Sequence, residues 1–189
     1  YELWVEGIQK GRTVVATNGH VEFLDLKVDG DASPGDEVKL DGERMLNGEG
    51  MLEAEVTWTA TEALSGTIEL VCNGNIVASL DGSAAPGEAL VLHAQVPVSE
   101  SSWICARRMD PSGHRSHSAP VYISVNDRPV RASAADANYF VAWIDGILEN
   151  LAPGGPWNQY FSHDLDVVQS RYQEARAIYA KVALEAQNP

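Results

Sequence analysis

The chain has 189 residues, of which 44% are apolar and 21% are charged, a composition typical of a folded globular protein. Its 27 acidic and 13 basic residues give a formal charge of −14, which disfavours nucleic-acid binding because phosphate backbones repel such a chain. The longest apolar runs are only strand-sized, so we expect no membrane-spanning helix and no membrane partner.

Basic side chains gather at one place in the sequence, at Arg107, Arg108, His114 and Arg115. This cluster is short, and Asp110 interrupts it, so it does not form the basic stripe of a nucleic-acid interface. We therefore expect no nucleic-acid partner.

Residues 1–10 place Leu3, Trp4 and Ile8 on one face of a helix, and Gly11 then ends the helical pattern. The sequence opens on this pattern with neither an initiator methionine nor a signal peptide. We interpret residues 1–12 as the helical tail of a domain that precedes them.

From Thr13 the apolar period changes to two, which is typical of strands. A first strand over 13–17 leads through a turn at Asn18-Gly19 to a second over 21–28. Asn73-Gly74 predicts a type I′ hairpin, and Pro97 indicates an edge or a strand exit. The further predicted strands are 52–60, 67–72, 75–80, 90–98, 102–108 and 120–126.

Short strands without intervening helices predict a mainly β fold, an immunoglobulin-like antiparallel β-sandwich over residues 13–130. A closed barrel is the alternative. We favour the sandwich because Trp58 and Trp103 are large enough to fill the space between two sheets. The predicted core consists of Leu52, Ala54, Val56, Trp58, Leu70, Leu92, Val96 and Trp103.

Residues 131–189 return to a helical period and predict two C-terminal α-helices. Ser133 and Asp136 resemble a capping box before an apolar row that begins at Phe140. A Pro-Gly-Gly-Pro run over 153–156 ends this helix, and a second begins near Ser162. The small alanines in its apolar row indicate a helix that packs closely on a neighbouring surface.

Five histidines are candidate metal ligands: His20, His93, His114, His117 and His163. Only His114 and His117 are close in sequence, and we expect them in a polar loop in which a hydrogen-bonding role is favoured over metal binding. The sequence contains no nucleophile motif for Ser or Cys catalysis. We therefore assign no catalytic, cofactor-binding or metal-binding residue.

Three other groups of residues admit a functional interpretation. The acidic residues of one turn-rich segment would suit calcium, but they are more often turn residues: Asp25, Asp29, Asp31 and Asp36. The tryptophans Trp4, Trp143 and Trp157 would suit a sugar-stacking platform, although a place in the core or in a contact between domains is favoured. Whether Cys72 and Cys105 form a disulfide stays open.

Several motifs occur in an order that resembles the C-terminal part of the CehA/McbA family of PHP-like metallohydrolases. They are Trp4–Gly19, Asn73-Gly74, Trp103–Arg107, Ser116–Tyr122 and Asp136–Asp145. His20 departs from this pattern, at a position where the family has proline. The resemblance implies that the divalent metal and its ligands belong to an N-terminal catalytic domain of the same polypeptide. It also makes a bacterial, exported parent protein plausible, and it transfers no catalytic residue to this chain.

Two functions follow from these observations. The first is a non-catalytic accessory domain of a metal-dependent hydrolase, whose partner is the N-terminal domain. The alternative is a freestanding immunoglobulin-like module that binds carbohydrate or protein. We also expect Leu3, Trp4 and Ile8, together with part of the last helix around Tyr172, Tyr179 and Val182, to contact that domain or a second copy in a homo-oligomer. The alternative is that the last helix packs on the sandwich of its own chain.

Overall fold

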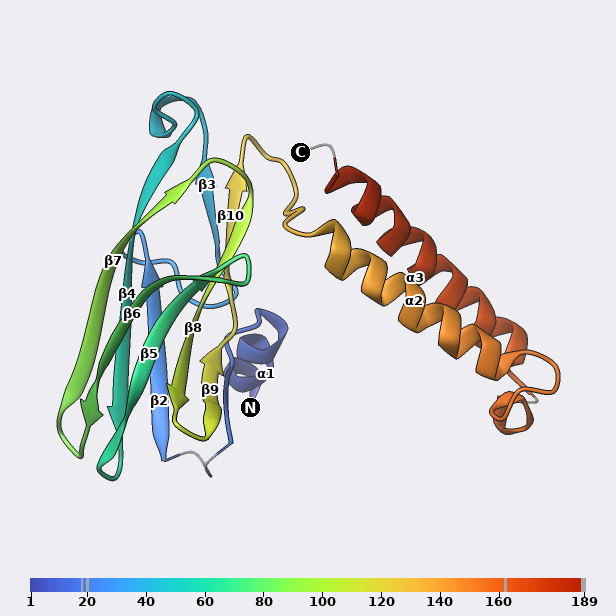
Figure 1. Cartoon of the computed structure of the whole chain (residues 1–189), viewed down its shortest axis with the longest axis horizontal. Coiled ribbons are helices and arrows are strands. Elements are labelled where there is room, and N and C mark those ends of the chain that lie inside the picture. Colours follow the sequence, from blue (N-terminus) through green and yellow to red (C-terminus); the bar gives the residue numbers. More distant parts are fainter. Residues whose placement is uncertain (18, 20, 162, 188–189) are drawn as a thin grey trace. The chain divides into compact units, whose positions relative to one another are not determined.

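The computed structural model describes residues 1–17, 19, 21–161 and 163–187, and it divides into two units at residues 130 and 131. Figure 1 shows strands in the first unit and a pair of helices in the second. The first unit contains α1 (Glu2–Gln9), β1 (Val14–Ala16), β2 (Glu22–Val28), β3 (Glu37–Leu40), the 3-10 helix η1 (Gly42–Arg44), β4 (Gly50–Ala60), β5 (Leu64–Cys72), β6 (Asn75–Ala84), β7 (Ala89–Val98), β8 (Ser102–Asp110), β9 (Gly113–Ser118) and β10 (Val121–Val125). The second contains α2 (Ala134–Leu151), the 3-10 helix η2 (Asn158–Phe161) and α3 (Leu165–Glu185).

Two sheets form the immunoglobulin-like sandwich, which confirms the predicted fold class. One has the antiparallel order β2-β4-β7. In the other, β8 pairs with β5, β9 and β10. Further out, β6 pairs with β5, β1 pairs with β9, and β3 pairs with β10. This sheet is not purely antiparallel as predicted, because β3 runs parallel to β10. The chain crosses over from β2 to reach that edge, which brings β3 alongside the last strand in the same direction.

The core lies between the inward faces of the two sheets. Strand β4 alternates between buried and more exposed residues along its whole length, so that every second side chain packs inward. Seven of the eight predicted core residues are buried: Leu52, Ala54, Val56, Trp58, Leu70, Leu92 and Val96. The period-two pattern therefore gave the inward direction correctly for all but one of the residues predicted from it.

Trp103 is the exception, and its prediction as a core residue was wrong. Ile104 and Ala106 are the buried residues of β8, whereas Trp103 is partly exposed and lies outside the core cluster. Adjacent residues of a strand point to opposite faces, so Trp103 lies on the outer face of its sheet. There it stands opposite Tyr122 of β10.

Several local predictions agree with the structure. The β5–β6 hairpin turns at Asn73 and Gly74, whose φ angles of 48° and 84° are those of a type I′ turn. Strand β7, which contains Pro97, lies at an edge of its sheet. The second C-terminal helix, predicted to begin near Ser162, begins at Leu165. Asn18, His20 and Ser162 themselves lie outside the described part of the chain.

An ion pair between Glu22 of β2 and Arg108 of β8 is buried between the sheets, with side-chain exposures of 0% and 3%. Arg108 Nη2 donates to Glu22 Oε1 at 3.0 Å, and Trp58 Nε1 donates to Glu22 Oε2 at 2.8 Å. The guanidinium also lies over the Trp58 indole, with Cζ 5.1 Å from the ring centroid. These contacts satisfy the buried carboxylate with donors from both sheets.

The second unit is an antiparallel hairpin of α2 and α3. Ser133 Oγ accepts a hydrogen bond from Asp136 N at 3.0 Å, which caps α2 at the predicted position. At the other end, the side-chain amides of Asn158 and Gln169 donate to Leu151 O, so polar groups satisfy the end of α2 beside the turn.

Replacing Trp58 by Ala should lower the free energy of unfolding by about 3 to 5 kcal/mol, because it removes a fully buried indole from the centre of the core. Trp103→Ala is the matched control and should cost less, since Trp103 packs outside the core cluster. Chemical denaturation of both variants measures the difference. Equal losses would contradict the placement of the two side chains.

Replacing Glu22 by Leu should lower the free energy of unfolding by about 3 to 5 kcal/mol, because Arg108 would remain buried with only its longer 3.7 Å contact to Asp110 in place of its close ion pair. The double variant Glu22→Leu/Arg108→Met should be more stable than Glu22→Leu alone, since it leaves no buried charge. Both variants deprive the Trp58 N–H of its acceptor, so that loss cancels in the comparison. Urea denaturation tests the order, and a double variant less stable than the single one would contradict it.

Candidate functional site

A hollow of about 440 Å³ lies on the outer face of the β2-β4-β7 sheet. Strand alternation turns Glu53 and Glu55 of β4 outward, and the register places them beside Gln95 and His93 of β7. Lys27 of β2 stands opposite Glu55 on the other side. The remaining lining residues are small: Gly30, Ala54 and Ala94. The side chains of Ala54 and Ala94 point into the core, so the hollow has a polar rim over a floor formed by the strand backbone.

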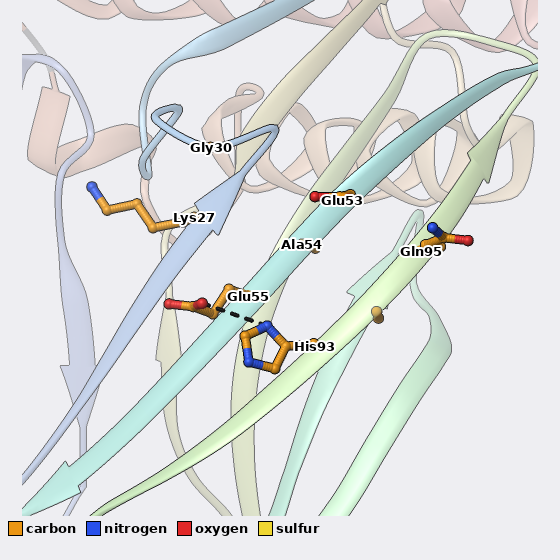
Figure 2. Close-up of a pocket in the computed structure, with 8 residues that line it drawn as sticks. Lys27, Gly30, Glu53, Ala54, Glu55, His93 and Gln95 are labelled. Atoms are coloured by element: carbon orange, nitrogen blue, oxygen red, sulfur yellow. Dashed lines mark ion pairs between the residues drawn. The ribbon is translucent and has the colours of Figure 1, made fainter.

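Glu55 and His93 form the one ion pair drawn in this hollow, with Glu55 Oε2 3.5 Å from His93 Nδ1 (Figure 2). Lys27 instead donates to Ser33 Oγ at 2.8 Å, and in Figure 2 Glu53 and Gln95 lie apart from the pair. Acid–base catalysis needs groups that converge on one reacting atom. This arrangement offers separate donors and acceptors, which suits the binding of a polar ligand better than catalysis.

The structure brings His114 and His117 together, with His117 Nδ1 3.0 Å from His114 Nε2. They lie on β9 and not in a loop as predicted, because residues 113–118 pair with both β8 and β1. Burial, and secondarily the neighbouring His114, lowers the pKa of His117. Within the described residues, no group of three or more His, Cys, Asp or Glu side chains is placed to hold a metal ion.

Among the residues that the structure describes, neither the other histidines nor the acidic cluster joins this pair. His93 belongs to the hollow, and His163 is exposed before α3. Asp29 forms an ion pair with Arg44. Asp36 accepts hydrogen bonds from Ser33 N and from Arg12, which lower its pKa. These two acids therefore stabilise turns, in agreement with the favoured interpretation.

The basic cluster is neutralised by neighbouring acids. Arg107 is paired with Glu69, and Arg108 is buried against Glu22. Arg115 Nε donates to Asp110 Oδ2 at 2.6 Å, and hydrogen bonds from Ser112 and Arg115 lower the pKa of Asp110 to about 2. Each of the three arginines therefore faces a carboxylate, which leaves no unopposed basic patch at this cluster.

Trp4, Trp143 and Trp157 are all exposed, so none of them lies in the core of this chain, and a contact between domains stays a prediction. Both cysteines are free thiols. Cys72 packs against the core, whereas Cys105 lies beside Val71 on the opposite face of the same sheet. Burial raises the pKa of both thiols.

Sequence reasoning missed two features, the buried Glu22–Arg108 pair and the hollow. Arg108 follows Ile104 and Ala106 at intervals of two, and Glu22 precedes Leu24 and Leu26 in the same way. Both charged residues thus occupy inward positions, which was the available signal. The hollow gave no such signal, because it depends on the register between three strands.

None of the helices among the described residues is long and apolar enough to cross a membrane.

No protein-family model and no curated protein sequence matches the chain. Among solved structures, the CARDB domain of PF1109 from Pyrococcus furiosus is 16% identical and aligns over 57% of this chain and 97% of its own, with a TM-score of 0.35. A crystal structure of that domain in complex with di-metal ions is 19% identical over 58% and 97%, with a TM-score of 0.34. The C-terminal domain of wzt is 10% identical over 66% and 86%, with a TM-score of 0.38.

Proposed function

We propose that this chain is a non-catalytic accessory module of a bacterial PHP-like metal-dependent hydrolase of the CehA/McbA type. The proposed family rests on the ordered motifs described above. The proposed role rests on one observation, that the segment ending α1 contacts the sandwich at Lys10 and Arg12 while the apolar side chains of α1 remain exposed. The divalent metal would belong to the N-terminal catalytic domain, which would be the partner of this module.

The attachment of α1 depends on a close approach of two backbone segments. Gly35 adopts a φ of +89° and lies so near Lys10 that a Cβ on Gly35 would be 1.5 Å from Lys10 O. Arg12 Nη2 also donates to Asp36 Oδ1 at 3.1 Å, and Gly35 N donates to Pro120 O at 2.8 Å. The end of α1 therefore lies against the turn that precedes β3.

The exposed face of α1 carries Tyr1, Leu3, Trp4 and Ile8, and the helix buries none of its residues. Apolar side chains grouped on a fixed helix mark an interaction surface, because their exposure to water is unfavourable unless a partner covers them. A preceding domain would cover this face and take its orientation from the sandwich.

The full polypeptide tests this role. If the proposal is correct, hydrogen exchange at residues 2–9 should be slower in the full polypeptide than in this chain alone. Leu3→Ser should lower the thermal stability of the catalytic domain in the full polypeptide. Leu46→Ser is the matched control, because Leu46 is 76% exposed and Leu3 is 83% exposed, and it should leave that stability unchanged. A reading frame without a metal-ligand-rich domain, or unchanged exchange at residues 2–9, would contradict the proposal.

The hollow on the β2-β4-β7 sheet favours a second candidate, an immunoglobulin-like module that binds carbohydrate. Its separate carboxylate, amide and imidazole groups match the donors and acceptors of a polyhydroxylated ligand. A glycan array should then show binding by this chain that is lost in Glu55→Gln and retained in Glu37→Gln, a change of an exposed glutamate on the other sheet. Binding unaffected by Glu55→Gln would exclude the hollow as the site.

A further inference from the structure

The two-helix unit buries few apolar side chains for its size. Among its described residues they are Ala137, Ile144, Ile147, Leu151 and Ala183. Two helices can cover only one side of each other, and helical domains usually enclose a core with three or more. The hairpin therefore has too little core to be complete by itself.

Aromatic side chains lie along one side of this hairpin. The Phe140 ring stacks on Tyr179 of α3, with centroids 4.9 Å apart, and makes edge contacts with Tyr139 and Trp143. Helical periodicity places Ile178 and Val182 on the same side of α3. We call this surface, formed by Tyr139, Phe140, Trp143, Ile178, Tyr179 and Val182, the aromatic face.

The opposite side of the hairpin is polar. Asp145 follows Phe140 by five residues, which at about 100° per residue places it about 140° around α2. There it accepts two hydrogen bonds from Arg176, one of them from Nη2 at 3.0 Å. The hairpin therefore presents one polar side and one apolar side, which is the pattern of half a helical bundle.

The charges of the aromatic face make it complementary to itself. Helical periodicity places Asp136 toward one end of this face and Arg171 toward the other, and both are exposed. Asp136 precedes Phe140 on α2, and Arg171 precedes Tyr179 on the antiparallel α3, so the two charged residues lie in opposite directions from the stacked rings. At 1.5 Å per residue they are separated along the hairpin by about 18 Å. Their midpoint lies close to the level of Trp143.

We propose that the aromatic face binds the same face of a second copy, forming an antiparallel four-helix bundle. A two-fold axis near Trp143 brings Asp136 of each copy to the level of Arg171 of the other. Opposite charges then lie at the same level at both ends of the bundle, which matters in a chain with a net charge of −14, where most acidic surfaces repel their own copies. The inference is independent of the accessory role and of any upstream domain.

Analytical ultracentrifugation of the complete chain tests the dimer. Ile178→Gln should weaken self-association by about tenfold or more, because it places a polar side chain at the centre of an apolar contact. Leu184→Gln is the matched control. Leu184 is 65% exposed and Ile178 is 63% exposed, but the two lie about 120° apart around α3, so Leu184 falls outside the aromatic face. Leu184→Gln should leave the dimer intact.

A charge-reversal pair tests the antiparallel arrangement. Arg171→Asp should weaken the dimer because it sets two acids against each other, and adding Asp136→Arg should restore association. Circular dichroism identifies any variant that loses helix content, and such a variant is replaced by Trp143→Gln. A wild-type chain that stays monomeric at high concentration would overturn the proposal. So would equal effects of Ile178→Gln and Leu184→Gln, or a double charge variant no better than Arg171→Asp.

Discussion

Glu22 and Arg108 lie at the centre of the sandwich, where water cannot screen or replace their interaction. A charge in such a place is tolerated only when it is paired and hydrogen-bonded. The pair meets that condition by using Trp58, which donates a hydrogen bond to the carboxylate and offers its ring face to the guanidinium. Because Glu22 and Trp58 belong to one sheet and Arg108 to the other, the two sheets can pack in one relative position only.

The same three residues show how far the sequence can be interpreted without a structure. Alternation in the strand around Trp58 predicted its burial correctly, because four small or aliphatic neighbours share its phase. In β8 the largest apolar residue, Trp103, has the opposite phase to Ile104 and Ala106, and side-chain size was given more weight than phase. Arg108 was considered only as a member of a basic cluster, although it shares the phase of Ile104 and Ala106. Residue type alone cannot identify a buried charge, since its burial depends on a partner 86 positions away in the chain.

Strand β9 was not predicted from the sequence, and the reason is similar. Strand β9 has the sequence Gly-His-Arg-Ser-His-Ser, in which the buried positions are filled by serines, so hydropathy gave no period-two signal. The buried hydroxyl of Ser118 is satisfied because its Oγ accepts a hydrogen bond from Ala106 N at 3.0 Å. The histidine pair could therefore be found by sequence spacing, but its place on a strand and the 3.0 Å separation of its nitrogens came only from pairing with β8 and β1.

The exposed surfaces differ in how well water solvates them. In the hollow on the β2-β4-β7 sheet, water can satisfy every polar group, so an empty hollow carries no energetic penalty and its shape alone does not require a ligand. Exposed apolar side chains on α1 and on the aromatic face gain nothing comparable from water, and their burial in a contact is favourable. The attachment of α1 through Gly35, and of the helices to each other through Asp145 and Arg176, keeps both surfaces ordered before any partner arrives. A surface that is already ordered loses little conformational entropy on binding, which is why these two faces, rather than the hollow, are the stronger candidates for the contacts of this chain.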